Sequence, residues 1–140
     1  MTRDCLLPML APLSMARARG CALSDLVRGL PACFTAADRL QGIETAVSQK
    51  LIAQLTTDPS SRAAFFADLG DEIAVDTTDG LRVSFSEDRV VHLRPSGNAP
   101  ELRCYAEAPS AETAQALVAR FLEDAKIAST YDDTSRSELS

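Results

Sequence analysis

The chain has 140 residues and a net charge of −6, with 46% hydrophobic and 24% charged residues. This composition is typical of one soluble globular domain, or of one domain with part of another. Because binding to a nucleic-acid backbone requires clustered Lys and Arg, the acidic balance argues against a DNA or RNA partner.

The cysteines are scattered, and none forms a Cys-x-x-Cys pair. The chain contains one histidine, His92, which offers little help as a metal ligand beside them. A zinc site is therefore not expected, and we predict no metal ligands in this chain. Unpaired cysteines in an acidic chain indicate reduced thiols and a cytoplasmic location. They are Cys5, Cys21, Cys33 and Cys104.

Residues 4–19 are apolar around nearly the whole circumference of a predicted helix, which indicates burial against a large partner. A secretory signal is a second interpretation of this stretch. Asp4, Pro8 and Pro12 argue against it, and the positive charges follow the apolar run, so we predict a structural helix. No run reaches the ~20 apolar residues that span a bilayer, so no membrane contact is expected.

A second short helix is predicted around residues 24–30, with Ser24 as N-cap and Asp25 at its positive end. Two such short helices cannot bury their own apolar surface. We therefore interpret residues 1–35 as the helical end of a preceding domain. A stretch of weak periodicity follows, and we place a linker or hinge at residues 36–43.

Residues 44–128 are predicted to form an α+β domain. A helical apolar stripe over residues 43–55 is followed by Asp58-Pro59, a helix-start pair. From residue 72 the apolar period changes to two, which predicts four short antiparallel strands, with Asp79-Gly80 as a hairpin turn. Ser110 starts a last helix that covers the four-stranded sheet together with the earlier helices. Residues 129–140 are expected to form a polar tail.

The crossing between the third and fourth predicted strands, residues 94–100, reads Arg-Pro-Ser-Gly-Asn-Ala-Pro. Arg94 offers a planar fork of donors that suits a phosphate or carboxylate. Gly97 permits positive φ and leaves no Cβ to block an oxyanion, and N–H groups around a glycine can form an anion-binding nest. The same residue types also occur in ordinary long hairpin loops, so composition alone leaves both interpretations open.

The stretch RPSGNAPELRCYAEA, residues 94–108, closely resembles the phosphate-binding loop and following strand of the α-D-phosphohexomutases, the phosphomannomutases and phosphoglucomutases among them. The common form of that loop is Arg-Pro-Ser-Gly-Thr-Glu-Pro, in a small C-terminal α+β domain of TBP-like type. The resemblance implies that the chain binds the phosphate of a hexose phosphate that is not being transferred. The residues that it assigns to this phosphate are Arg94, Ser96, Gly97 and Asn98.

This sequence departs from the common loop at two positions, where Asn98 replaces Thr and Ala99 replaces Glu. The sequence contains no Thr-x-Ser-His-Asn-Pro phosphoserine motif and no Asp-x-Asp-x-Asp Mg²⁺ motif. The resemblance therefore implies a C-terminal piece of a mutase that interconverts mannose or glucose 1-phosphate and 6-phosphate. We expect the catalytic serine and Mg²⁺ to belong to the remaining mutase domains, and the isolated piece to be inactive. A stand-alone protein-interaction module remains the alternative, supported by the apolar residues 4–30.

Overall fold

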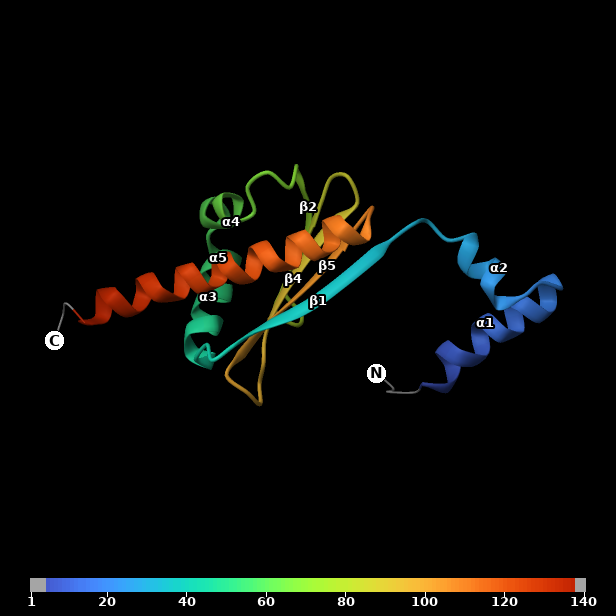
Figure 1. Ribbon diagram of the computed structural model, residues 1–140, viewed down its shortest axis with the longest axis horizontal. Coiled ribbons are helices and arrows are strands. Elements are labelled where there is room, and N and C mark those ends of the chain that lie inside the picture. Colours follow the sequence, from blue (N-terminus) through green and yellow to red (C-terminus); the bar gives the residue numbers. More distant parts are fainter. Residues whose placement is uncertain (1–4, 138–140) are drawn as a thin grey trace. The chain divides into compact units, whose positions relative to one another are not determined.

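The computed structural model describes residues 5–137, with side chains through residue 129, and divides into two compact units between Ala32 and Cys33 (Figure 1). The first unit holds the helices α1 (Leu6–Arg19) and α2 (Leu23–Arg28). The second unit contains five strands and three helices among its described residues: β1 (Phe34–Gln41), α3 (Thr45–Thr57), α4 (Pro59–Phe65), β2 (Glu72–Asp76), β3 (Leu81–Phe85), β4 (Arg89–Pro95), β5 (Glu101–Ala108) and α5 (Ala111–Ser137).

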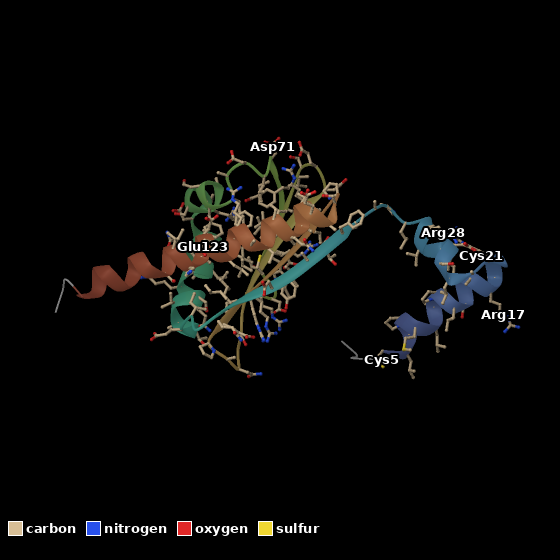
Figure 2. The ribbon with its side chains drawn as sticks, viewed as in Figure 1. Cys5, Arg17, Cys21, Arg28, Asp71 and Glu123 are labelled. Atoms are coloured by element: carbon tan, nitrogen blue, oxygen red, sulfur yellow. The ribbon has the colours of Figure 1, made fainter. Side chains whose placement is uncertain are left out.

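The first unit leaves most of its apolar surface uncovered. Figure 2 shows its side chains radiating from α1 and α2, with Cys5 before α1 and Cys21 after it. Among the described residues of this unit, only Ala16 is buried. The expected N-cap at Ser24 is wrong, because Ala22 precedes α2 and its N–H donates to the Asp25 carboxylate at 3.0 Å. The exposed large apolar side chains are Leu6, Leu7, Met9, Leu10, Leu13, Met15, Leu23, Val27 and Leu30.

The second unit contains one antiparallel sheet of five strands, one strand more than the sequence predicts. Its order is β1-β5-β4-β3-β2. The extra strand is β1, which pairs with β5 from Phe34↔Ala108 to Gln41↔Glu101. The α+β class is therefore correct, and the expected number of strands is not.

The predicted linker at residues 36–43 lies largely within β1. Asp38 interrupts the alternation of Ala36 and Leu40, and Ala and Asp have low intrinsic preference for strands. Pairing with β5 overrides that preference, because β5 would otherwise present unpaired backbone groups at the sheet edge. The boundary between the two units consequently precedes β1.

The core lies between one face of the sheet and the helices α3, α4 and α5, and Figure 1 shows α5 lying across the strands. Helix α5 has one apolar stripe, and every member of it is buried: Ala114, Leu117, Val118, Phe121, Leu122 and Ala125. Phe65 and Phe66 pack as core rings, with centroids 5.0 Å apart, and each also contacts the Phe121 ring. Cys104 is likewise a core residue, and burial raises the pKa of its thiol to about 12.

Helix α5 begins as predicted and ends later. The Ser110 hydroxyl accepts a hydrogen bond from the Thr113 N–H at 3.1 Å, which caps the helix. The helix then continues through Ser137, so the expected polar tail is helical up to that residue, and residues 138–140 lie outside the described part. Within residues 5–137, no helix combines the length and apolar content of a bilayer span.

The turn between β2 and β3 lies tightly against β4 because residue 80 is glycine. Gly80 has a φ of +96°, and a Cβ at this position would lie 2.3 Å from the Leu93 carbonyl oxygen and 3.1 Å from the Arg94 Cα. Any other L-residue would be strained in this conformation and would also collide with the strand. Gly80 thereby holds the preceding residue, Asp79, beside Arg94.

A single arginine ties α3, α4 and β2 together. Arg62 is buried, and its Nε and Nη2 donate to the Glu72 carboxylate at 2.7 and 3.0 Å. Its Nη1 also donates to the Leu55 carbonyl at 2.9 Å, which satisfies a backbone acceptor near the end of α3. The Asp58 carboxylate caps α4 by accepting from the Ser60 N–H, as the sequence predicts.

Replacing Arg62 with Met is expected to lower the free energy of unfolding by about 2 kcal/mol, because it removes charge-assisted hydrogen bonds and leaves buried acceptors unsatisfied. Urea unfolding measures this change. The matched control is Arg28→Met, whose arginine is exposed and forms an ion pair with Asp25 on α2. An equal, small change in both variants would contradict the role of Arg62 as a tie between elements.

The same pair makes stability depend on pH. Hydrogen bonding from Arg62 holds the pKa of Glu72 below its usual range. A carboxyl whose pKa is depressed by folding stabilises the fold above its unfolded pKa and loses that contribution as pH falls through the folded pKa. Wild type should therefore lose more stability than Glu72→Gln between neutral and acid pH, as measured by thermal melts. Parallel pH profiles for the two proteins would contradict this prediction.

Candidate functional site

The Arg-Pro-Ser-Gly loop, residues 94–100, comprises the last two residues of β4 and the connection to β5. Its base is closed by backbone hydrogen bonds, because the Ser96 N–H donates to the Glu101 carbonyl at 3.0 Å. Its far end is joined to the end of β1, because the Gly42 N–H donates to the Pro100 carbonyl at 2.9 Å. The loop is therefore anchored to a rigid sheet on both sides, which is where a site is held most accurately.

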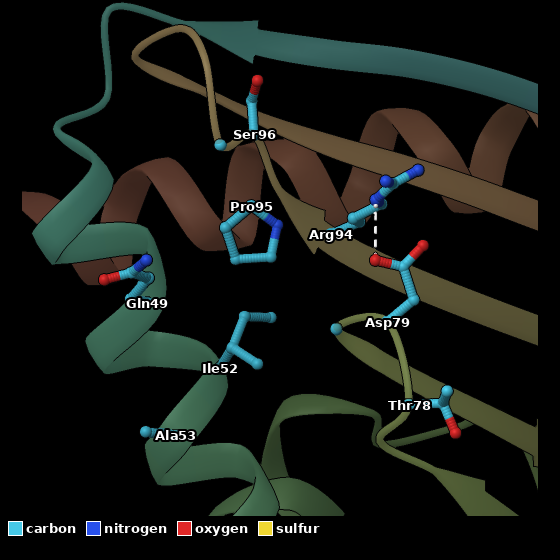
Figure 3. Close-up of a pocket in the computed structure, with 10 residues that line it drawn as sticks. Gln49, Ile52, Ala53, Thr78, Asp79, Arg94, Pro95 and Ser96 are labelled. Atoms are coloured by element: carbon cyan, nitrogen blue, oxygen red, sulfur yellow. Dashed lines mark ion pairs between the residues drawn. The ribbon is translucent and has the colours of Figure 1, made fainter.

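Arg94, the first residue of the motif, is held by an ion pair. Its Nε lies 3.0 Å from the Asp79 Oδ1, and both side chains are partly exposed. Figure 3 shows Arg94 extending toward Asp79 from the end of its strand. The interaction engages one edge of the guanidinium, and this group has five N–H donors in total. Asp79 thus orients Arg94 and leaves donors for a ligand.

Ser96 and Asn98 interact within the loop. Ser96 is buried, and its Oγ lies 3.4 Å from the Asn98 N–H, which donates to it. The hydroxyl hydrogen can still be donated to a ligand, because this contact uses only the oxygen as acceptor. Asn98 is exposed, so its amide group lies at the surface of the loop.

Gly97 differs in part from the expectation. It does not adopt positive φ, so the conformational reason predicted for a glycine here is wrong. The steric reason is consistent with the structure, since a Cβ built at this position meets nothing within 4 Å. The fold itself therefore does not require glycine at residue 97.

A pocket of about 360 Å³ lies between this loop, the turn before β3 and helix α3 (Figure 3). One wall is apolar, where Pro95 faces Ile52 of α3, and the other carries Asp79 and Arg94. Such a pocket suits a ligand with one charged end and a less polar body. The lining residues are Gln49, Ile52, Ala53, Thr78, Asp79, Gly80, Arg94, Pro95, Ser96 and Gly97.

His92 supports the same region from the sheet. It lies on the face opposite the core, and its Nε2 donates to the Asp79 carbonyl at 2.6 Å. Its ring centroid lies 5.6 Å from that of Tyr105 on β5. These contacts give His92 a structural role, because they help to hold the Asp79 turn beside β4.

On the far side of β5, two arginines share one carboxylate. The Glu101 Oε1 accepts from Nε and Nη2 of Arg103 at 2.9 and 2.6 Å, and its Oε2 accepts from Nη1 of Arg39 at 3.2 Å. These hydrogen bonds, above all those from Arg103, hold the pKa of Glu101 below its usual range. Glu101, the first residue after the loop, therefore links β1 to β5.

The predicted loop residues lie together, and their neighbours were missed by the sequence prediction. Asp79 was identified only as a turn residue, although its position next to β4 follows from the hairpin order. Arg39 could not be found while residues 36–43 were taken as a linker. Within residues 5–137, no three His, Cys, Asp or Glu side chains are placed to hold a metal ion.

Residues 43–124 match the family model for the phosphoglucomutase/phosphomannomutase C-terminal domain. A phosphomannomutase of Salmonella muenchen is 41% identical over 126 residues, and one of Sinorhizobium fredii is 39% identical over 123 residues. These alignments cover 89% and 86% of this chain, which spans 26% of the length of each relative.

A solved structure of a phosphoglucomutase/phosphomannomutase family protein from Burkholderia thailandensis is 30% identical, with a TM-score of 0.47. The alignment covers 79% of this chain and 20% of that one. The family model matches more than half of the chain, including the whole Arg-Pro-Ser-Gly loop and the strands on both sides of it. This chain therefore belongs to the phosphoglucomutase/phosphomannomutase family.

Proposed function

We propose that this chain is the C-terminal part of a phosphohexomutase and that its Arg-Pro-Ser-Gly loop grips the phosphate that is not transferred. The observation that carries the proposal is the grouping of Arg94, Ser96 and Gly97 at the rim of one pocket. The ligand would be mannose or glucose 1- or 6-phosphate. Asn98 would complete the phosphate contacts through its side-chain amide.

The geometry of Arg94 supports recognition of an oxyanion. The Asp79 ion pair holds the guanidinium at the mouth of the pocket, so less rotamer entropy is lost when a ligand binds. A phosphate would accept two parallel hydrogen bonds from the remaining donors. The open space over Gly97 lets an oxygen approach the backbone at that position.

Binding the phosphate in this way would position the sugar. A phosphohexomutase must present first one and then the other end of its substrate to one reacting group. Holding the distal phosphate converts binding energy into orientation of the reacting end. We also propose that the domain moves to close the cleft and to exclude water during phosphoryl transfer.

The reacting groups would lie elsewhere in the mutase. We propose that the other domains supply the phosphorylated serine and bind Mg²⁺, which would stabilise the charge of the transferring phosphoryl group. This chain would then contribute no catalytic residue and would be inactive alone. The enzyme would act in the cytoplasm, where reduced thiols such as those of this chain persist.

A second candidate is a stand-alone protein-interaction module, and the exposed apolar surface of α1 and α2 favours it. In the mutase proposal, other mutase domains cover this surface. Adding phosphosugar separates the two candidates, because a module without a ligand site would not respond to it at the loop.

We expect millimolar inorganic phosphate or mannose 6-phosphate to shift the amide resonances of Ser96, Gly97 and Asn98 in a titration of the 140-residue chain. Gly97→Ala should weaken this response at least about threefold, since a methyl group would occupy space that an oxyanion needs. Its melting temperature should stay unchanged, because the added Cβ meets no atom within 4 Å. Wild-type titration curves in Gly97→Ala, or no response in the wild type, would contradict the proposal.

In the full-length enzyme, Arg94→Ala is expected to raise KM for the hexose phosphate about tenfold or more, and to lower kcat where orientation is also lost. Arg82→Ala is the matched control, since Arg82 lies on the same face of the sheet, is similarly exposed and is paired with Glu107. Steady-state kinetics of both variants measure the effect. Equal kinetic constants for wild type and Arg94→Ala would remove Arg94 from the site.

A further inference from the structure

Three arginines form a row across the face of the sheet that points away from the core. The strand register places Arg39 of β1 opposite Arg103 of β5, and Arg103 opposite Arg94 of β4. Residues opposite each other on paired strands point to the same face, with Cβ atoms about 5 Å apart. Like charges in this arrangement destabilise a sheet unless anions lie between them.

The anion that the chain itself places beside Arg39 and Arg103 is Glu101, whose carboxylate accepts hydrogen bonds from both guanidinium groups. Its side chain is 6% exposed, whereas those of Arg39 and Arg103 are 55% and 40% exposed. Glu101 engages two N–H groups of Arg103 and one of Arg39, out of five on each guanidinium. Glu101 therefore engages only some of the N–H groups of each guanidinium group.

A pocket of about 250 Å³ lies beside Arg39 and Arg103. Its walls are Ala37, Asp38, Arg39, Arg103 and Tyr105. Ala37 lies opposite Tyr105 in the register, and its small side chain leaves space for the pocket beside the tyrosine side chain. The Asp38 carboxylate accepts from the Arg39 backbone N–H at 2.7 Å, which turns it toward the main chain.

We propose that this pocket binds a phosphate group, held by the guanidinium groups of Arg39 and Arg103 and by the Tyr105 hydroxyl. Two planar forks on adjacent strands match the several acceptor oxygens of a phosphate, and the phenol adds one further donor. The site lies over β1 and β5 and is separate from the Arg-Pro-Ser-Gly loop, which joins β4 to β5. It does not require that loop to bind phosphate, so the two proposals succeed or fail independently.

An amide-detected NMR titration of the 140-residue chain tests the site, with inorganic phosphate in one arm and mannose 6-phosphate in the other. We expect Ala37 and Tyr105 to shift, with an affinity about fivefold or more weaker in Arg39→Gln. A response to mannose 6-phosphate alone would show that the pocket selects a phosphate ester. An equal response in both arms would show that it recognises the phosphate group itself. No shift of Ala37 and Tyr105 in either arm would overturn the proposal.

Three variants make the outcome specific. Arg82→Gln removes the same charge from the same face and should titrate like wild type, since Arg82 pairs with Glu107 outside the pocket. Gly97→Ala should weaken the loop response and leave Ala37 and Tyr105 unchanged. Glu101→Gln removes the carboxylate that holds Arg39 and Arg103 and should weaken the response of Ala37 and Tyr105.

Arg39 lies on an edge strand with an exposed side chain, so Arg39→Gln is expected to fold, and its melting temperature verifies this. Arg39→Lys keeps the positive charge but loses the planar guanidinium group. It should bind phosphate with an affinity between those of wild type and Arg39→Gln. Equal affinities for wild type, Arg39→Gln and Arg82→Gln would overturn the proposal. Loss of the Ala37 and Tyr105 shifts in Gly97→Ala would overturn it as well, because the anion would then lie on the loop.

Discussion

The candidate site depends on one residue, Glu101, where the loop enters β5. Its carbonyl accepts from the Ser96 N–H at 3.0 Å and its own N–H donates to the Ala99 carbonyl at 2.8 Å, so its backbone closes the loop. Its nearly buried carboxylate binds Arg39 and Arg103 and thereby fixes the edge strand β1 to β5. The same residue therefore closes the loop and joins two arginines of the row, whose spacing the strand register sets.

The sequence was most informative where local chemistry and tertiary context agree. The Asp58-Pro59 helix start, the Asp79-Gly80 turn and the start of α5 at Ser110 were each predicted from short patterns, because caps and turns are encoded locally. The loop at residues 94–100 was found from its donor chemistry and from its resemblance to a mutase motif.

What could not be predicted depends on contacts between distant segments. β1 was missed because pairing with β5, about seventy residues away, outweighs the weak strand preference of its own residues. Because β1 was missed, the position of Arg39 next to β5 and its hydrogen bond to the Glu101 carboxylate were missed as well. Asp79 was recognised as a turn residue, but its ion pair with Arg94 arises only when Gly80 brings the turn against β4.

The most direct measurement is a crystal structure of the 140-residue chain soaked with arsenate, a phosphate analogue that is located by its anomalous scattering. We expect an anomalous peak at the Arg-Pro-Ser-Gly loop, within hydrogen-bond distance of the Arg94 guanidinium and the Ser96 hydroxyl. Arsenate bound elsewhere on the chain, with no peak at this loop, would contradict the phosphate-binding role.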